Sequence, residues 1–150
     1  MANKGKFKPL NPHKYKGDIS KIIYRSSWEL NVMMELDRQD DVLQWSSEEF
    51  VIPYKNPITG RRHRYFVDFW VKKADQSIQL VEVKPWHESH PPSTRNKKPR
   101  RLITEVHKWG INISKWSAAE KLCKQKGWDF IVMTEKGEAT EWRNHLMEGF

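Results

Sequence analysis

The sequence predicts a small α/β domain with a mixed central β-sheet flanked by helices. Two runs rich in aromatic and β-branched residues, 61–73 and 77–85, are separated only by a short turn and are expected to pair as an antiparallel hairpin. Helical patterns lie before and after this hairpin, which is typical of an α/β arrangement. The length of 150 residues suits one domain with a modest core, and we expect it to span residues 18–150.

The first helix is expected to begin at Ser26. Trp28, Val32 and Leu36 then recur at the spacing that places side chains on one face of a helix. Glu29 follows Ser26 by three residues, which fits a capping box at the start of this helix.

After the hairpin the chain is expected to form a proline-rich loop over residues 85–101, two helices, an apolar strand and a last helix. Gly127 is expected to terminate the second of these helices, because a C-terminal glycine readily adopts the left-handed conformation. The expected ranges of the helices and strand, in chain order, are 102–110, 114–127, 128–135 and 136–150.

Charge and composition restrict the class of partner. The formal net charge is +8, and such a basic balance favours polyanions, either nucleic acid or an anionic membrane. No apolar run approaches the roughly 20 residues that a membrane-spanning helix needs. The first residues contain no apolar stretch, so we expect no secretory signal, and Ala2 excludes N-terminal myristoylation. One cysteine, Cys123, allows no internal disulfide and is expected to be a core residue on a helix.

The N-terminal segment and the tryptophans leave alternatives open. Residues 1–17 contain five lysines and no acid, and we expect a flexible basic arm that either holds a phosphate backbone or is simply solvated. The eight tryptophans are expected to be core residues, although one or two could stack on bases.

Three charged residues converge in the apolar hairpin. Asp68 lies on its first strand, and Glu82 and Lys84 share a face of the second, since side chains alternate along a strand. Two adjacent carboxylates repel each other unless one binds a proton or a cation lies between them. A hard divalent cation prefers such oxygen ligands together with phosphate and water, and metal-assisted attack of water on a phosphodiester uses this set of groups. The alternative is a set of ion pairs that Lys84 forms with Glu82 or Asp68.

An aspartate on one strand followed by Glu-x-Lys on the next resembles the core motif of the PD-(D/E)xK nuclease superfamily. Val67 stands where the name of the motif has proline, a position that varies. The resemblance implies a restriction-endonuclease-like fold in which Asp68 and Glu82 bind Mg²⁺ or Mn²⁺. It also implies that the Val83 carbonyl is a third protein ligand and that Lys84 positions the attacking water.

The stretch from about residue 24 to residue 135 resembles the TnsA-type transposase endonucleases, with a helix and an apolar strand completing the core. By this resemblance Glu29, on the first helix, is a further acid that could hold a second metal ion or a metal-bound water. Its capping role is an equally complete explanation, so both remain open.

The segments SSWELNVM, YFVDFW and VEVKPW also make the sequence similar to the head-completion nucleases of tailed phages. That resemblance implies an enzyme of the host cytoplasm during phage assembly that acts on packaged DNA. It further implies head, portal or neck proteins as partners and association with the virion. The alternative is a non-catalytic DNA-binding or virion structural protein that plugs the head; no signature of an RNA-binding module is present.

DNA contacts are expected from basic residues beyond the second strand of the hairpin. A helix lysine, Lys115, could face the site, or could be an ordinary exposed lysine. His87 and His90 are interpreted as loop residues, because two histidines without a further ligand do not make a zinc site. No base-reading motif is present, so recognition should follow backbone and shape. The cluster beyond the strand consists of Arg95, Lys97, Lys98, Arg100 and Arg101.

Overall fold

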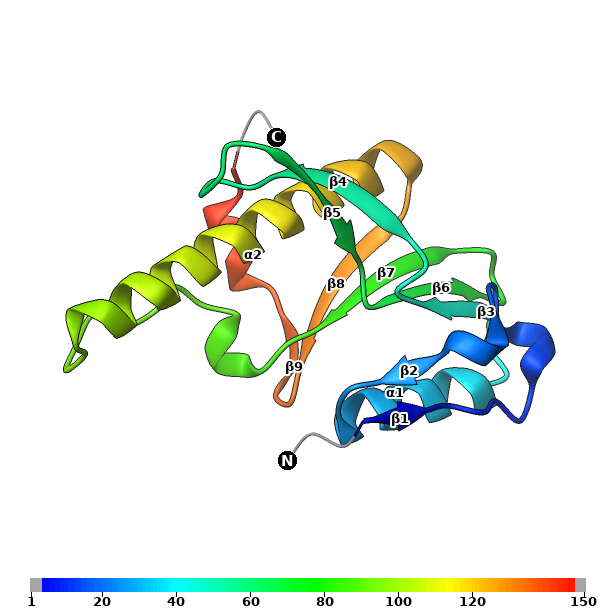
Figure 1. Ribbon diagram of the computed structural model, residues 1–150. Coiled ribbons are helices and arrows are strands. Elements are labelled where there is room, and N and C mark those ends of the chain that lie inside the picture. The colour runs from blue at the N-terminus through cyan, green and yellow to red at the C-terminus, as the bar shows by residue number, and fades with distance from the viewer. Residues whose placement is uncertain (1–3, 148–150) are drawn as a thin grey trace.

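The centre of the protein is a five-stranded sheet. The computed structural model describes residues 4–147. The sheet has the strand order β3-β6-β7-β8-β9, and two short hairpins, β1-β2 and β4-β5, lie outside it (Figure 1). The strands are β1 (Gly5–Lys6), β2 (Ile23–Tyr24), β3 (Val42–Ser47), β4 (Val51–Lys55), β5 (Arg62–Phe66), β6 (Phe69–Lys73), β7 (Ile78–Val83), β8 (Asp129–Thr134) and β9 (Gly137–Ala139).

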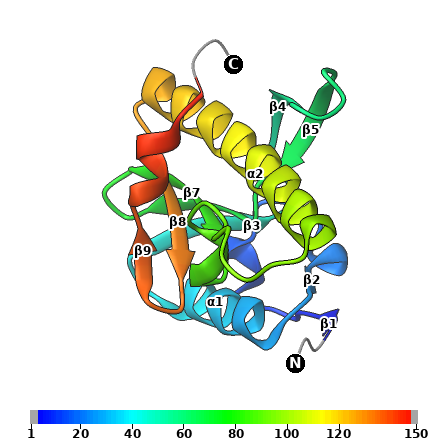
Figure 2. The ribbon, with the colours of Figure 1, turned by 90° about the vertical axis from the view of Figure 1, so that its left-hand side faces the viewer.

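Strand directions make the sheet mixed, as the sequence predicts. β6 pairs with both β3 and β7 antiparallel, so the expected hairpin forms. β7 pairs with β8 in parallel, and helix α2 (Pro99–Lys126) supplies the crossover that a parallel pair requires. The two longer helices lie on opposite sides of the sheet, α2 on one and α1 (Ser27–Arg38) on the other (Figure 2).

The first strand of the predicted hairpin is wrong in one respect, because residues 61–73 form two strands with a break at Val67 and Asp68. Tyr65 and Val67 pack in the same core cluster as Trp70, although one continuous strand would place Trp70 on the opposite face. β5 instead pairs with β4, which lies against α2, whereas β6 belongs to the main sheet. The break therefore lets consecutive segments serve two different sheets.

Helix α1 begins where the sequence predicts. Ser26 is its N-cap, and its hydroxyl accepts a hydrogen bond of 3.1 Å from the amide of Glu29. The carboxylate of Glu29 accepts from the amide of Arg25 at 3.4 Å, so the reciprocal half of the expected capping box reaches one residue further back.

The two helices expected at 102–110 and 114–127 are one continuous helix, α2. Residues 110–112 continue it, because the partly buried Trp109 before them and the buried Ile113 after them pack against one core. Gly127 ends the helix with a φ of 72°, as expected for a C-terminal glycine. Cys123 is buried on this helix, which confirms its predicted place.

The expected last helix is mostly wrong. The segment after β8 first forms the short strand β9 and then a 3-10 helix, η4 (Glu141–His145). Trp142 is completely buried there, and its indole donates a hydrogen bond of 2.8 Å to the carbonyl of Ala139. Residues 148–150 of the predicted helix lie outside the described residues.

Most of the expected flexible arm is packed against the domain. Phe7 and Tyr15 are buried and make edge contacts with the ring of Trp45. The carboxylate of Asp37 accepts hydrogen bonds from the amides of Leu10 and Asn11, at 2.8 and 3.1 Å. These contacts hold the described part of the segment against α1 and β3; residues 1–3 lie outside the described residues. The segment also contains the 3-10 helix η1 (Pro12–Lys14), and a second, η2 (Ile19–Lys21), follows it.

Large aromatic side chains fill the core on both faces of the sheet. Trp45 lies on the α1 side, and Trp116 and Trp142 lie on the α2 side, all three completely buried. The expectation that tryptophans are core residues is therefore confirmed for these three. None of the helices among residues 4–147 has the length and apolarity that crossing a bilayer requires.

Candidate active site

The hairpin register brings Asp68 and Glu82 together. Phe69 pairs with Val81, so the next residues outward, Asp68 and Glu82, lie opposite each other at the end of the β6–β7 ladder. The Asp68 carboxylate accepts a hydrogen bond of 2.8 Å from the amide of Val83, which fixes its orientation. Glu82 is 5% exposed, so the two acids meet in a largely water-excluded position.

The electrostatics of this pair are unfavourable without a cation. Burial, and then the charge of Glu82, raise the pKa of Asp68 well above its ordinary value. The hydroxyl of Tyr65 is buried beside them and forms no hydrogen bond with another described residue. Burial, followed by the charges of Glu82 and Asp68, raises the pKa of Tyr65 as well. Two carboxylates that disfavour each other's charge are suited to share a cation.

Lys84 is the residue that follows β7, and its side chain lies next to Glu82. Its Nζ atom lies 3.9 Å from the Oε2 atom of Glu82, at the long limit for an ion pair. The backbone of Lys84 is fixed by a hydrogen bond of 3.0 Å from its amide to the carbonyl of Met133 on β8. The ammonium group thus lies beside the carboxylates without a close bond that would hold it there.

Glu29 approaches from α1 while its backbone completes the helix cap. Burial, and then the charge of Glu48, raise its pKa, and the charge of Glu82 adds to the effect. Glu29 is therefore within electrostatic reach of the acid pair, and its capping and metal-site roles remain compatible. Glu48, which the sequence did not single out, forms an ion pair with Arg25 next to Glu29.

Lys115 lies over the rings of Tyr54 and Tyr65 beside the site rather than on a free surface. Its Nζ atom is 5.5 Å from the ring centre of Tyr65 and 5.7 Å from that of Tyr54. Burial lowers the pKa of Lys115, and the charges of Glu82 and Lys84 also act on it. The structure thus places this lysine next to the predicted centre. The sequence did not predict Tyr65 as a site residue, because one continuous strand would place it on the face opposite Asp68. The break at Asp68 brings it to the site.

The predicted basic cluster divides into paired and exposed residues. Lys97 and Arg101 both form ion pairs with Glu105, which takes up part of their charge. The other three members are exposed at the surface and form no ion pair with another described residue. They are Arg95, Lys98 and Arg100.

The donor set fits a hard cation bound through few protein ligands. Among residues 4–147, no three or more acids, histidines or cysteines converge as a metal-binding group. Asp68 and Glu82 supply two carboxylates, which matches the way Mg²⁺ is held by one or two carboxylates with substrate phosphate and water. His87 and His90 lie in and beside a short 3-10 helix, η3 (Trp86–Glu88), in the loop where they were expected.

Comparison with known proteins identifies the family. Residues 39–135 match the family described as TnsA-like endonuclease N terminal, which is more than half of the chain. The chain belongs to the TnsA-like endonuclease family. The match contains Asp68, Glu82, Lys84 and Lys115, whereas Glu29 precedes it. The head completion nuclease of Enterobacteria phage T4 is 39% identical over an alignment of 143 positions, and the alignment covers 91% of this chain and 94% of that protein. The resemblances in the sequence analysis are thereby confirmed.

Membership of the TnsA-like endonuclease family agrees with the observed architecture. The mixed sheet, with helices on both sides, is an α/β arrangement consistent with the restriction-endonuclease-like fold expected from the sequence. The acid pair lies within the family match, at the end of the central hairpin.

Proposed function

We propose that the protein is a metal-dependent DNA nuclease that hydrolyses phosphodiester bonds with low sequence specificity. The observation that carries this proposal is the convergence of Asp68, Glu82 and Lys84 at the end of the β6–β7 hairpin. In a structural protein, burying two opposed carboxylates would cost stability without any compensating role. The family match and the similarity to a head completion nuclease support the same activity.

We infer the catalytic role of each residue from where its side chain lies in the site. Asp68 and Glu82 would hold Mg²⁺ or Mn²⁺, with the Val83 carbonyl as a third protein ligand. The bound ion would polarise the phosphate and lower the pKa of a bound water. Lys84 would orient the attacking water, which adds to phosphorus as the P–O bond to the leaving strand breaks. Glu29 would hold a second metal ion or a metal-bound water from the α1 side.

The biological setting is part of the same proposal. We expect the enzyme to act in the host cytoplasm during phage assembly, on packaged DNA before heads join tails. Head, portal or neck proteins would be its partners, and it would associate with the virion. Arg95, Lys98 and Arg100 would contact the DNA backbone without reading sequence, since they are exposed and cationic.

The test is a cleavage assay on supercoiled and linear duplex DNA with Mg²⁺, with Mn²⁺ and with EDTA. We expect metal-dependent cutting that appears first as nicked circles, because one catalytic centre cuts one strand per encounter. Lys84→Ala and Glu82→Ala should lower the rate by about 10²–10⁴-fold, and Lys121→Ala, an exposed lysine of α2, should leave it unchanged.

Three results would decide between catalysis and a structural role in assembly. If folded wild-type protein binds DNA but does not cut it with either metal, the non-catalytic head-plugging alternative replaces the nuclease. If Glu82→Ala abolishes cutting and leaves association with phage particles intact, catalysis and assembly are separate roles of the chain. Loss of both in a folded variant would show that they depend on the same residue.

A further inference from the structure

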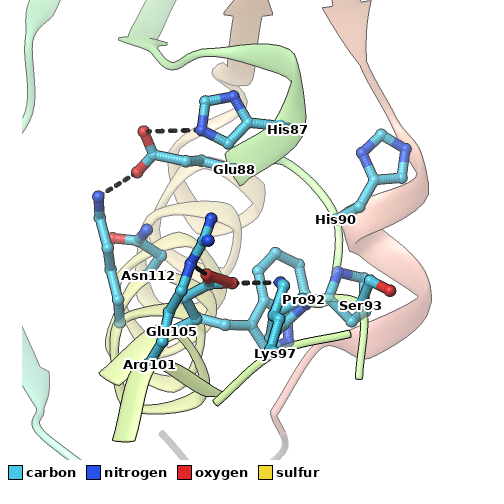
Figure 3. Close-up of a pocket in the computed structure, with 12 residues that line it drawn as sticks. His87, Glu88, His90, Pro92, Ser93, Lys97, Arg101, Glu105 and Asn112 are labelled. Carbon is cyan, nitrogen blue, oxygen red and sulfur yellow. Dashed lines mark hydrogen bonds and ion pairs between the residues drawn. The ribbon is translucent and has the colours of Figure 1, made fainter. Parts of the chain in front are cut away.

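A pocket separate from the predicted catalytic residues lies next to them along the chain. It has a volume of about 490 Å³, within the range of ligand sites, and is formed by the segment after β7 and the first half of α2 (Figure 3). Asp68, Glu82 and Lys84 do not line it. Its position in the chain is adjacent to theirs, because His87 and Glu88 follow β7 directly.

Asn112 is the most unusual residue of this pocket. It is 6% exposed and lines the pocket from α2, yet its side-chain amide forms no hydrogen bond with another described residue. The amide atoms are not among the fully buried polar atoms that lack a partner, so they remain accessible from the pocket. Asn112 therefore offers two donors and an acceptor to a molecule in the pocket.

The walls of the pocket are held by ion pairs that leave an excess of positive charge. Lys108 lies 2.5 Å from Glu88, and Arg101 lies 2.9 Å from Glu105, which also pairs with Lys97. Three permanent cations thus face two acids. The side chain of Arg101 is 72% exposed, so its guanidinium can reach an anionic group at the mouth of the pocket.

Trp109 adds an aromatic surface. Its indole is half-buried and is positioned by edge contacts with Trp116 and His145. An aromatic face, an unpaired amide and a guanidinium match the three parts of a nucleotide: a stacked base, the base edge and the phosphate. A phosphate alone would need neither the aromatic surface nor the amide.

The pocket is close enough to the catalytic centre to hold part of the same strand. Asn112 and Lys115 are one turn apart on α2, about 4.5 Å along the helix axis. Lys115 in turn lies within electrostatic reach of Glu82, Asp68 and Lys84. A nucleotide in the pocket would therefore neighbour the phosphodiester presented to those residues.

We infer that this pocket binds one unpaired nucleotide of the DNA strand being cut, with its base on Trp109 and Asn112 and its phosphate at Arg101. The inference rests on the proposed nuclease function and specifies its substrate: DNA with unpaired nucleotides at an end or junction. A paired base cannot enter without leaving its stack, and this cost in free energy is least for a base that is already unpaired.

Binding is measured with the Glu82→Gln protein, so that cutting does not interfere. The probes are a blunt DNA hairpin, the same hairpin with a two-nucleotide single-stranded extension on either strand, and that extension carrying abasic sites. We expect the extension on one strand to improve binding about tenfold, and the abasic extension to lose the gain. Free deoxynucleoside monophosphate should compete only weakly, because it lacks the contacts of the duplex.

Asn112→Asp in the same protein tests the amide. It keeps the shape of the side chain but replaces donors by a negative charge, and should remove most of the gain from the extension. Asn144→Ala, an exposed asparagine on η4, is the control and should retain the gain. Thermal unfolding verifies that each variant is folded; the abasic comparison needs no variant at position 112.

Equal affinity for blunt and extended hairpins, or for abasic and intact extensions, would overturn the inference. So would strong binding of the free monophosphate with no gain from an extension, because the pocket would then be a mononucleotide site. These outcomes are independent of the proposed function, which fails only if wild-type protein does not cut DNA with either metal.

Discussion

Replacing Asp68 by asparagine should stabilise the metal-free protein while abolishing DNA cleavage. The asparagine oxygen can still accept the hydrogen bond from the amide of Val83, at 2.8 Å in the wild-type structure. What the change removes is a buried negative charge opposite Glu82. A group that is costly in the empty site and needed for catalysis is the expected signature of a metal ligand.

The cost of protonating Asp68 sets an upper limit on how much Asp68→Asn can stabilise the protein. Burial and the charge of Glu82 raise the pKa of Asp68 well above its ordinary value of 3.8. Because the folded pKa is the higher one, stability is lost as the pH rises from the unfolded value towards the folded one. Taking up a proton at pH 7 costs about 1.4 kcal/mol for each unit between the pH and the unfolded pKa, or at most about 4 kcal/mol. Asp68→Asn should therefore gain about 1–4 kcal/mol at pH 7, which is about 3–15 °C in Tm.

The assay is thermal unfolding in EDTA at pH 7 and near pH 4. The gain in Tm should be present at pH 7 and should shrink near pH 4, where Asp68 is protonated in the folded state and about half protonated in the unfolded state. Mg²⁺ should raise the Tm of the wild type more than that of the variant. Asp75→Asn is the matched control: hydrogen bonds from Ser77 lower the pKa of Asp75, so its replacement should lower Tm at pH 7. An Asp68→Asn protein that is less stable at both pH values, or that still cuts DNA, would refute the reasoning.

Two further predictions concern stability. Arg143→Ala should lower Tm by about 5–15 °C, because it leaves the nearly buried Glu120 carboxylate and the Phe130 carbonyl, 2.6 Å from the guanidinium, without their donor; an unchanged melting curve would show that the ion pair contributes nothing. Gly127→Ala should cost about 1–2 kcal/mol in chemical denaturation from its φ of 72° alone, since among residues 4–147 no side chain or backbone beyond the adjacent helical residues lies within 4 Å of the added carbon. Gly110→Ala, inside α2 with ordinary packing space, should instead gain about 0.5–1 kcal/mol, and the same sign for both glycines would contradict this account.

The sequence predicted the elements whose signals are local. The hairpin of β6 and β7 could be predicted because its turn is short and its strands are strongly apolar. The start of α1 at Ser26 and the end of α2 at Gly127 follow from capping chemistry that depends on a few neighbouring residues.

The errors occurred where distant contacts decide. Gly110 and Asn112 suggest a break between two helices, but the packing of Trp109 and Ile113 against one core carries α2 through them. Likewise, lysines in the first residues suggest a solvated arm, whereas the segment is anchored by the burial of Phe7 and Tyr15 against Trp45. Neither contact can be read from spacing along the chain.

The residues of the candidate site likewise separate into those that local sequence predicts and those that depend on tertiary contacts. Asp68, Glu82 and Lys84 could be predicted to meet because one hairpin register sets their positions. Tyr65 and Asn112 could not, since each reaches its place through the packing of α2 over the sheet. The residues that would carry the chemistry are thus encoded locally, and those that would shape the substrate depend on tertiary structure.

The break between β5 and β6 explains how an acid can be held in an apolar hairpin. A continuous strand would bind the next amide of β7 through its backbone, but β6 begins only at Phe69. The Asp68 carboxylate accepts from the amide of Val83 instead, so the side chain completes the ladder where the backbone leaves it. The same turn of the chain directs Tyr65 towards α2 and Lys115. The break between β5 and β6 therefore orients the Asp68 carboxylate and gives the amide of Val83 on β7 a hydrogen-bond acceptor. It also brings the site next to α2, the helix that contains Asn112. Restoring a regular strand here would be expected to remove all three features together.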